Sequence, residues 1–268
     1  WPTKIKMMDA VWTPCKYSDE CLMLSSSPKS HAIIPIPTDV TKYTKDYQPI
    51  IPANLIDNKF LFYFIGEDIQ RKNLDLVIRA FHCEFDKGEQ VGLVIKTSRP
   101  GLDDNQAYTY IDNKINNIKN TLRLYADANQ YRREIIITDR LSEGEIYALH
   151  KQCHTFVMPS SGEGWNLPAA DAAGFGNKVL MTDTGCSQYA NYLIRAETTR
   201  VFTPDKPMHD LFTSRESWLE PSQSNIQITM RWAFNTRNTK DLSMPKKVIN
   251  ELSYSAVGEQ ICRALSQV

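Results

Sequence analysis

Residues 155–182 read TFVMPSSGEGWNLPAADAAGFGNKVLMT, and the fold class can be inferred from this stretch. Its two ends, Thr155–Met158 and Lys178–Thr182, are short apolar runs of the kind that forms strands buried on both faces. Between them, Leu167–Ala173 is rich in small residues, and Pro168 suits the first turn of a helix. A strand, a helix and a second strand in this order form a βαβ unit, which joins parallel strands.

The same alternation continues on both sides of this unit. Apolar runs of strand length are separated by stretches with helical periodicity, such as Leu74–Phe85, and Ser142 opens a capping box that predicts a helix to about Gln152. This order predicts an α/β fold with a doubly wound, Rossmann-like parallel sheet. The other expected strands are Phe60–Ile65, Val91–Ile95, Glu134–Thr138 and Arg200–Phe202, and the other expected helices are Asn105–Asn129, Ser187–Ile194 and Tyr254–Val268.

Composition excludes several classes of protein. The 268 residues include 31 Lys+Arg and 31 Asp+Glu, and this balance argues against nucleic-acid binding, which needs a basic face. The chain contains no run of 18 apolar residues, which a membrane-spanning helix would need, and no secretory signal opens it. The six scattered cysteines form no Cys-x2-Cys pair, so we expect free thiols in the cytoplasm and no metal site. Because the chain begins at Trp1, we expect a fragment of a longer protein.

The loop after the strand Thr155–Met158 carries the clearest chemical signal. Gly162 and Gly164 let the backbone turn sharply and approach a ligand closely. The helix that follows offers free N–H groups to an anion. Glu163 and Asp171 are carboxylates that can accept hydrogen bonds from vicinal sugar hydroxyls. The set suits a ligand with a sugar, a diphosphate and a ribose, although an ordinary strand–turn–helix with solvated acids is the alternative.

Residues 145–191 resemble the donor-binding core of glycosyltransferase family 4, which has the two-domain GT-B fold. The family's pattern is Gly-Glu-Gly-aromatic-Gly-Leu-Pro with a Glu-x7-Glu pair, and it is followed by Thr-Asp-x-x-Gly. Asp171 replaces the second Glu and keeps its charge, and Asn166 stands where the family usually has Gly, so it could crowd the donor sugar or hydrogen-bond to it. The matching residues here are Gly162, Glu163, Gly164, Trp165, Asn166, Leu167 and Pro168, then Thr182 to Gly185.

The resemblance implies a role for each matching residue. Glu163 would be catalytic and contact the transferred sugar near the reacting carbon. Asp171 would hold the ribose hydroxyls. Backbone N–H groups of Trp165, Asn166 and Leu167 would meet the sugar and diphosphate, although Trp165 could instead pack in the core.

A second matching site follows the strand Phe60–Ile65. Gly66 is followed by Arg71-Lys72-Asn73, as in the family's element of Gly and then Arg-Lys-Asn/Gly. Lys72, and after it Arg71, would be catalytic because negative charge develops on the departing diphosphate. Many relatives carry Arg directly after the glycine, where this chain has Glu67, so Lys96 after the next strand is a further candidate. The alternative for all three cations is a solvated surface position.

Two more residues are assigned to donor binding. Arg140 could lie near the base or phosphate, and Leu141 could pack against the nucleobase. The resemblance also divides the chain: residues 1–50 would be the end of an N-terminal domain and a linker, residues 51–250 the nucleotide-sugar domain, and residues 251–268 a helix that crosses back.

The resemblance implies a retaining, metal-independent hexosyltransferase that needs no cofactor, with a nucleotide-diphosphate sugar as co-substrate. This chain would supply the donor-binding half, and the acceptor would be a glycan, lipid or protein hydroxyl. The missing N-terminal domain, or a partner chain in its place, would complete the enzyme. The alternative is a non-catalytic nucleotide-sugar or glycan-binding module of GT-B fold.

Overall fold

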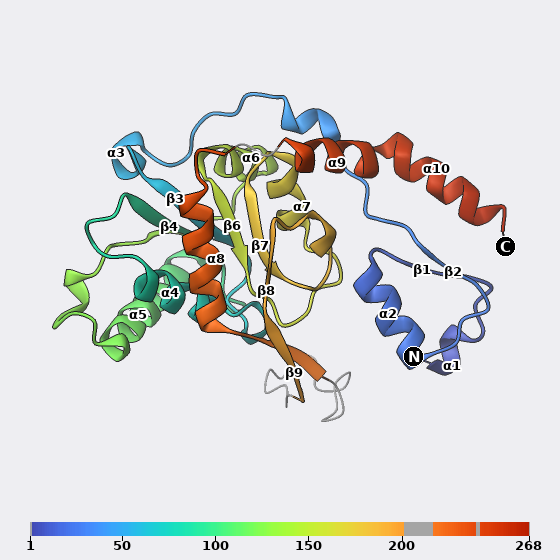
Figure 1. Cartoon of the computed structure of the whole chain (residues 1–268), viewed down its shortest axis with the longest axis horizontal. Helices are drawn as coiled ribbons and strands as arrows, with labels where there is room; N and C mark the ends of the chain where they lie inside the picture. The colour runs from blue at the N-terminus through green and yellow to red at the C-terminus, as the bar shows by residue number, and fades with distance from the viewer. Residues whose placement is uncertain (1, 201–216, 240–241, 268) are drawn as a thin grey trace.

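The computed structural model describes residues 2–200, 217–239 and 242–267, and a parallel sheet forms its centre (Figure 1). Six strands lie in the order β5-β4-β3-β6-β7-β8, and every neighbouring pair is parallel. Sequential strands on both sides of β3 make this a doubly wound sheet, which confirms the predicted fold class. The strands are β3 (Phe60–Ile65), β4 (Val91–Lys96), β5 (Ile135–Ile137), β6 (Thr155–Met158), β7 (Lys178–Thr182) and β8 (Tyr192–Ile194).

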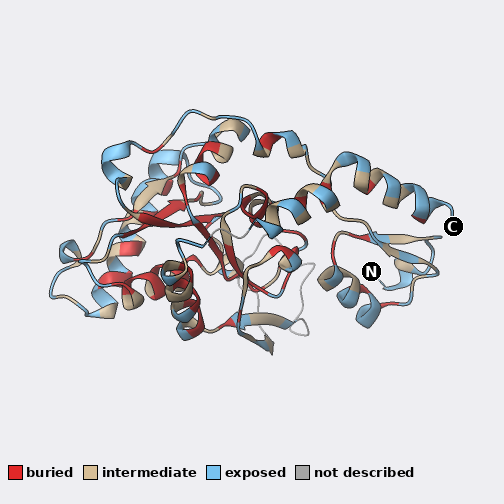
Figure 2. Ribbon diagram, turned by 45° about the horizontal axis from the view of Figure 1, so that its top comes forward, coloured by how far each residue is buried: buried red, intermediate tan, exposed pale blue. Residues whose placement is uncertain are grey.

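Helices cover both faces of the sheet, so its central strands are buried along their length (Figure 2). On one face α4 packs against α5 and α8, and on the other α7 packs against α9. α6 lies beside α7, because His150 of α6 stacks on Phe175, which caps α7. The helices are α4 (Leu74–Glu84), α5 (Asp104–Leu122), α6 (Glu143–Gln152), α7 (Leu167–Gly174), α8 (Gln223–Asn235) and α9 (Ser243–Leu252).

Two predictions near the sheet edge were wrong. Ser187–Ile194 is not one helix: a 3-10 turn, η4 (Ser187–Tyr189), is followed by the edge strand β8. The amide of Asn191 fixes this strand, since its Oδ1 accepts from the Val179 N–H at 2.8 Å. The strand expected at Arg200–Phe202 is instead β9 (Ala196–Arg200), which pairs antiparallel with β10 (Ser217–Pro221) outside the main sheet, and Phe202 lies beyond the described residues.

The first residues form a small unit beside the domain. β1 (Val11–Thr13) and β2 (His31–Ile33) pair in parallel, with α1 (Pro2–Ile5) and α2 (Lys16–Ser25) around them. The connection between β2 and β3, here called the linker, holds η1 (Val40–Tyr43) and α3 (Ala53–Ile56). The last helix, α10 (Tyr254–Leu265), follows α9 directly and extends toward the side where both termini lie (Figures 1 and 2).

Candidate active site

The loops after β3, β4, β5 and β6 meet at the carboxyl edge of the sheet, where ligands bind in folds of this type. Two features lie there. One is a cluster of charged side chains from the loops after β3 and β6. The other is a cavity of about 480 Å³ bounded by the loops after β3, β4 and β5.

The charged cluster joins the three residues with predicted catalytic roles. Lys72 Nζ lies 2.6 Å from Glu163 Oε1, and Arg71 NH1 lies 3.0 Å from Glu163 Oε2. Arg71 also donates to the carbonyl of Gly162. The Glu163 side chain is 7% exposed, whereas Lys72 and Arg71 keep 16% and 32% of their surface in solvent. The carboxylate is therefore enclosed, and the two cations remain reachable from solution.

Asn73 explains why Arg71 and Lys72 point at the loop after β6. The short 3-10 turn η2 (Gln70–Lys72) ends at Asn73, whose φ of 54° lies in the left-handed region that Asn tolerates. Its side-chain amide donates to the carbonyl of Pro159 at 2.8 Å and to Ser161 Oγ at 2.9 Å. The Ser161 N–H in turn donates to the carbonyl of Arg71 at 2.8 Å. These bonds join the two loops. The asparagine of the motif is thus a site residue that our motif analysis did not single out.

The structure of the Gly-rich loop shows where the Trp165 side chain lies and why Asn166 can stand in place of the usual glycine. Trp165 is 5% exposed and packs edge-on to Tyr189, so its side chain belongs to the core. Asn166 has φ 78°, which accounts for the usual glycine at this position, and its Oδ1 accepts from the Ala169 N–H as a helix cap. Leu167 is 56% exposed at the start of α7.

The N-terminal unit also contacts this loop. Cys15 Sγ lies 3.3 Å from the carbonyl oxygen of Gly164, and the Ser18 hydroxyl donates to the same oxygen at 3.2 Å. Gly164 is exposed, yet its carbonyl is held from outside the domain by the start of α2. Nothing in the local sequence pattern indicated this contact.

The cavity brings four predicted donor-binding residues together. Gly66, Lys96, Arg140 and Leu141 all line it. Burial lowers the pKa of Lys96, although the nearby Asp104 and Asp139 oppose this effect. Sequence reasoning missed the polar residues next to Lys96 and Arg140, which a search of every strand end would have found. They are Thr97, Ser98 and Thr138.

Asp171 is not joined to the charged cluster. Lys42 Nζ of the linker lies 2.6 Å from Asp171 Oδ1, and the Tyr43 hydroxyl donates to the same oxygen at 3.3 Å. Burial raises the pKa of Asp171, while the Lys42 ammonium opposes that rise. Lys42 and Tyr43 lie far from Asp171 in the sequence, and no motif pointed to them.

The described parts of the chain also bear on metal binding and on membrane insertion. No group of three or more His, Cys, Asp or Glu side chains there is placed to hold a metal ion. None of the helices described is both long and apolar enough to cross a membrane.

Comparison with solved structures identifies the fold as that of GT-B glycosyltransferases. The match to Anabaena HepE, solved with UDP and glucose, covers 100% of this chain and 66% of that protein, with 12% identity and a TM-score of 0.68. The match to sucrose-phosphate synthase from Thermosynechococcus elongatus covers 99% of this chain and 60% of that protein, with 15% identity and a TM-score of 0.65. The chain therefore spans no more than two thirds of these proteins.

A shorter structure matches almost in full. The C-terminal domain of a glycosyl transferase group 1 family protein from Francisella tularensis gives 14% identity and a TM-score of 0.51, with 80% of this chain and 96% of that domain covered. The family model "Glycosyl transferases group 1" matches residues 46–227, so the chain belongs to that family. A search of curated protein sequences found no match.

Proposed function

We propose that this chain is the donor-binding half of a retaining, metal-independent glycosyltransferase of the family 4 type. It would transfer a hexose from a nucleoside-diphosphate sugar to an acceptor hydroxyl. The observation that carries the proposal is the enclosed Glu163 between two partly exposed cations, Lys72 and Arg71, at the carboxyl edge of the sheet.

The charges of the cluster match the needs of this reaction. The bond between the anomeric carbon and the diphosphate oxygen breaks, and a bond to the acceptor oxygen forms. The electron pair of the broken bond remains on the diphosphate, where Lys72 and Arg71 stabilise it. The acceptor proton passes to the departing diphosphate or to a group outside this chain. Two cations and the N-terminus of α7 thus supply the positive charge that a divalent ion gives elsewhere.

The cavity is proposed as the nucleoside site. Its volume of about 480 Å³ is within the range of small-molecule pockets, roughly 300–1,000 Å³. Lys96 and Arg140 would meet the phosphates or base, and Leu141 would pack against the base. Both contacts of Asp171 use Oδ1, so we propose Oδ2 as the acceptor for ribose hydroxyls.

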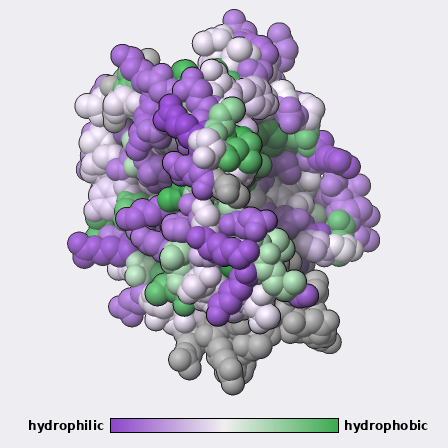
Figure 3. Space-filling view, turned by 90° about the vertical axis from the view of Figure 1, so that its right-hand side faces the viewer, coloured by the Kyte–Doolittle hydropathy of each residue, from purple (hydrophilic) through white to green (hydrophobic). Residues whose placement is uncertain are grey.

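The share of the relatives' length that this chain covers, and the exposed apolar residues of the N-terminal unit, support a proposal about partners. It spans 60–66% of the first two relatives, and Met7, Met8 and Leu24 of the N-terminal unit are exposed. The face with both termini is mostly hydrophilic, with separate hydrophobic groups (Figure 3). We propose that an N-terminal GT-B domain, or a partner chain, completes this side and binds a glycan, lipid or protein acceptor. The six free cysteines suit the cytoplasm.

One observation favours a second candidate, a non-catalytic nucleotide-sugar or glycan-binding module. Asp171 is already paired with Lys42, and its position in the family pattern is the one that holds ribose. Addition of the N-terminal half would separate the candidates, because only the first yields transfer.

Thermal unfolding with UDP, GDP, ADP, CDP and their sugar conjugates tests the donor site. A ligand at 100 times its Kd stabilises by about 2.7 kcal/mol, which raises Tm by roughly 5–10 °C for a chain of this length. We expect such a rise with one base and none with its nucleoside. Equal behaviour of all nucleotides and nucleosides would refute a diphosphate site.

A further inference from the structure

The loop after β3 carries both cations of the charged cluster, and its two ends are held in different ways. Asn73 fixes the end that leads into α4. At the other end Asp68 is only 2% exposed, although its neighbours Glu67 and Gln70 are exposed. A buried carboxylate in a loop needs specific partners, because burial of an unpaired charge is costly. The partners of Asp68 therefore decide where this loop lies.

Two contacts bind Asp68 to the connection between β4 and α5, and a third binds it to α5 itself. Its N–H donates to the carbonyl of Ser98 at 2.8 Å. Its carbonyl accepts from Arg99 NH1 at 2.5 Å. Its Oδ1 lies 2.6 Å from Lys114 Nζ on α5. The main chain and the side chain are both anchored, so Asp68 cannot shift alone.

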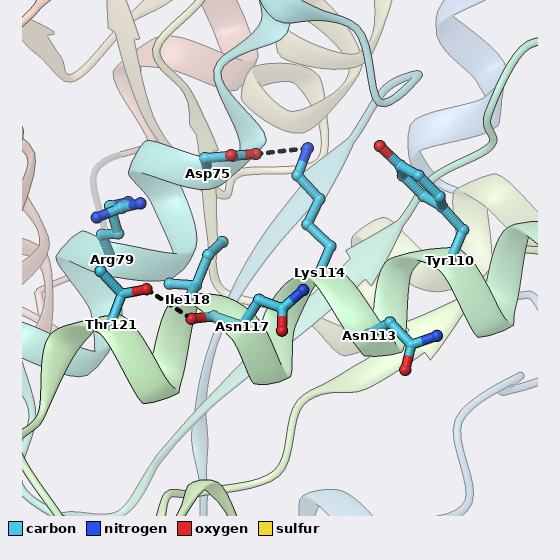
Figure 4. Close-up of a pocket in the computed structure, with 8 residues that line it drawn as sticks. All are labelled: Asp75, Arg79, Tyr110, Asn113, Lys114, Asn117, Ile118 and Thr121. Atoms are coloured by element: carbon cyan, nitrogen blue, oxygen red, sulfur yellow. Dashed lines mark hydrogen bonds and ion pairs between the residues drawn. The ribbon is translucent and has the colours of Figure 1, made fainter.

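Lys114 links the loop to a second element. Its Nζ also lies 2.6 Å from Asp75 Oδ1 on α4, and Figure 4 shows the side chain reaching from α5 to that carboxylate. Burial by itself would lower the pKa of Lys114, but hydrogen bonds to Asp68 and Asp75 reverse this effect and raise it. The ammonium thus stays charged and binds the two carboxylates together.

The surroundings of Asp68 Oδ2 show which side chain holds the Asp68 carboxylate in place. It is buried without a hydrogen bond, and Arg99 NH1 is 3.5 Å away. Among the described groups, Lys114 is the one that gives this carboxylate a side-chain hydrogen bond. Loss of the Lys114 ammonium would leave both oxygens unsatisfied, and the loop would move to hydrate them.

We infer that Lys114 and Asp68 are positioning residues for the diphosphate site. Neither touches Glu163. They fix the loop at Asp68 as Asn73 fixes it at the other end, so that Arg71 and Lys72 between them are held ready for the anion. The inference rests on the proposed function, since it assigns the diphosphate as the group that these cations meet. Preorganisation of this kind favours binding because the protein does not rearrange when the ligand arrives.

The test compares Lys114→Met with two matched variants of the same chain. Asp75→Asn is the control, because it removes the other partner of Lys114. The Asp75 side chain is 48% exposed, so water can replace its contact. Lys114→Arg restores the charge. The first measurement is the rate of tryptic cleavage after Arg71 and Lys72 in the folded protein. The second is the Kd for UDP, or for the nucleotide identified by thermal unfolding, from calorimetry.

We expect cleavage at least about tenfold faster in Lys114→Met, because the loop is released at Asp68. Each cation would make a charge-assisted contact to the diphosphate, and loss of one such contact weakens binding by about tenfold or more, so we expect the Kd to weaken by that amount. Asp75→Asn should behave like the wild type, and Lys114→Arg should recover most of both losses. If Lys114→Met does not fold, Asp68→Asn replaces it, since it keeps the side-chain shape.

Wild-type cleavage rates in Lys114→Met would overturn the inference. A Kd that changes only in proportion to Tm across all variants, Asp75→Asn included, would also overturn it, because that is the behaviour of a merely structural ion pair. If the wild type binds no nucleoside diphosphate, the proposed function fails. The cleavage rates then still decide whether Lys114 fixes the loop.

Discussion

Replacement of Lys42 by Met should destabilise the domain and reveal the charge of Asp171. Lys42 and Asp171 side chains are 8% and 15% exposed, and their charged atoms lie 2.6 Å apart. Removal of one partner of a buried ion pair costs about 3–5 kcal/mol, because the other charge remains buried. Asp171 keeps some contact with water, so we expect the lower end, about 3 kcal/mol, which lowers Tm by roughly 6–12 °C. Lys42 Nζ also lies 4.9 Å from the centroid of the Tyr147 ring, and methionine removes this cation–π contact as well.

The loss should depend on pH in a defined direction. Burial raises the pKa of Asp171, so the folded state binds a proton that the unfolded state releases, and the free energy of unfolding falls as pH rises through this window. Without Lys42 the pKa rises further. The difference in Tm between Lys42→Met and the wild type should therefore be larger near pH 8 than near pH 5.

Thermal unfolding followed by circular dichroism measures this effect, with a double variant as control. Lys42→Met combined with Asp171→Asn contains no unpaired charge and should regain at least about 2 kcal/mol. If the double variant is as unstable as Lys42→Met, the loss comes from packing and the electrostatic reasoning is refuted. A loss independent of pH would refute it equally.

Three further predictions concern the site. Glu163→Ala should abolish transfer, assayed with the N-terminal half supplied, and keep the circular dichroism spectrum of the fold; loss of the fold would make Glu163 structural. Lys72→Ala should weaken nucleoside-diphosphate binding by about tenfold, as a charge-assisted contact is worth roughly 1.5–3 kcal/mol, and an unchanged Kd would exclude its phosphate role. Gly185→Ala should cost at least about 2 kcal/mol in urea unfolding, because φ is 57° there and a Cβ would lie 2.4 Å from the Trp165 carbonyl oxygen; a smaller cost would mean that the loop can relax.

The central strands could be predicted because their signal is local. β3, β6 and β7 begin and end where the apolar runs do, since strands buried on both faces need continuous apolar sequence. The edge strand β8 has a mixed burial pattern over three residues, and such a short segment cannot be distinguished from a helix by periodicity.

The candidate site was predictable where the topology defines it. Gly66 follows β3, Arg140 follows β5, and Lys96 ends β4 between them, so the three meet at one edge of the sheet. The pairing of Lys42 with Asp171 was not predictable, because it joins residues 129 positions apart, 171 less 42, without a pattern in either segment. Side-chain contacts of this kind depend on the folded geometry of the linker.

Two contacts join the start of α2 to the Gly-rich loop at the residue next to Glu163. The Cys15 thiol and the Ser18 hydroxyl both contact the carbonyl oxygen of Gly164, the residue after Glu163. Displacement of α2 from the loop would break both contacts, whereas Glu163 would keep its ion pairs with Arg71 and Lys72. The N-terminal unit therefore shares one carbonyl group with the loop of the residue proposed to meet the transferred sugar.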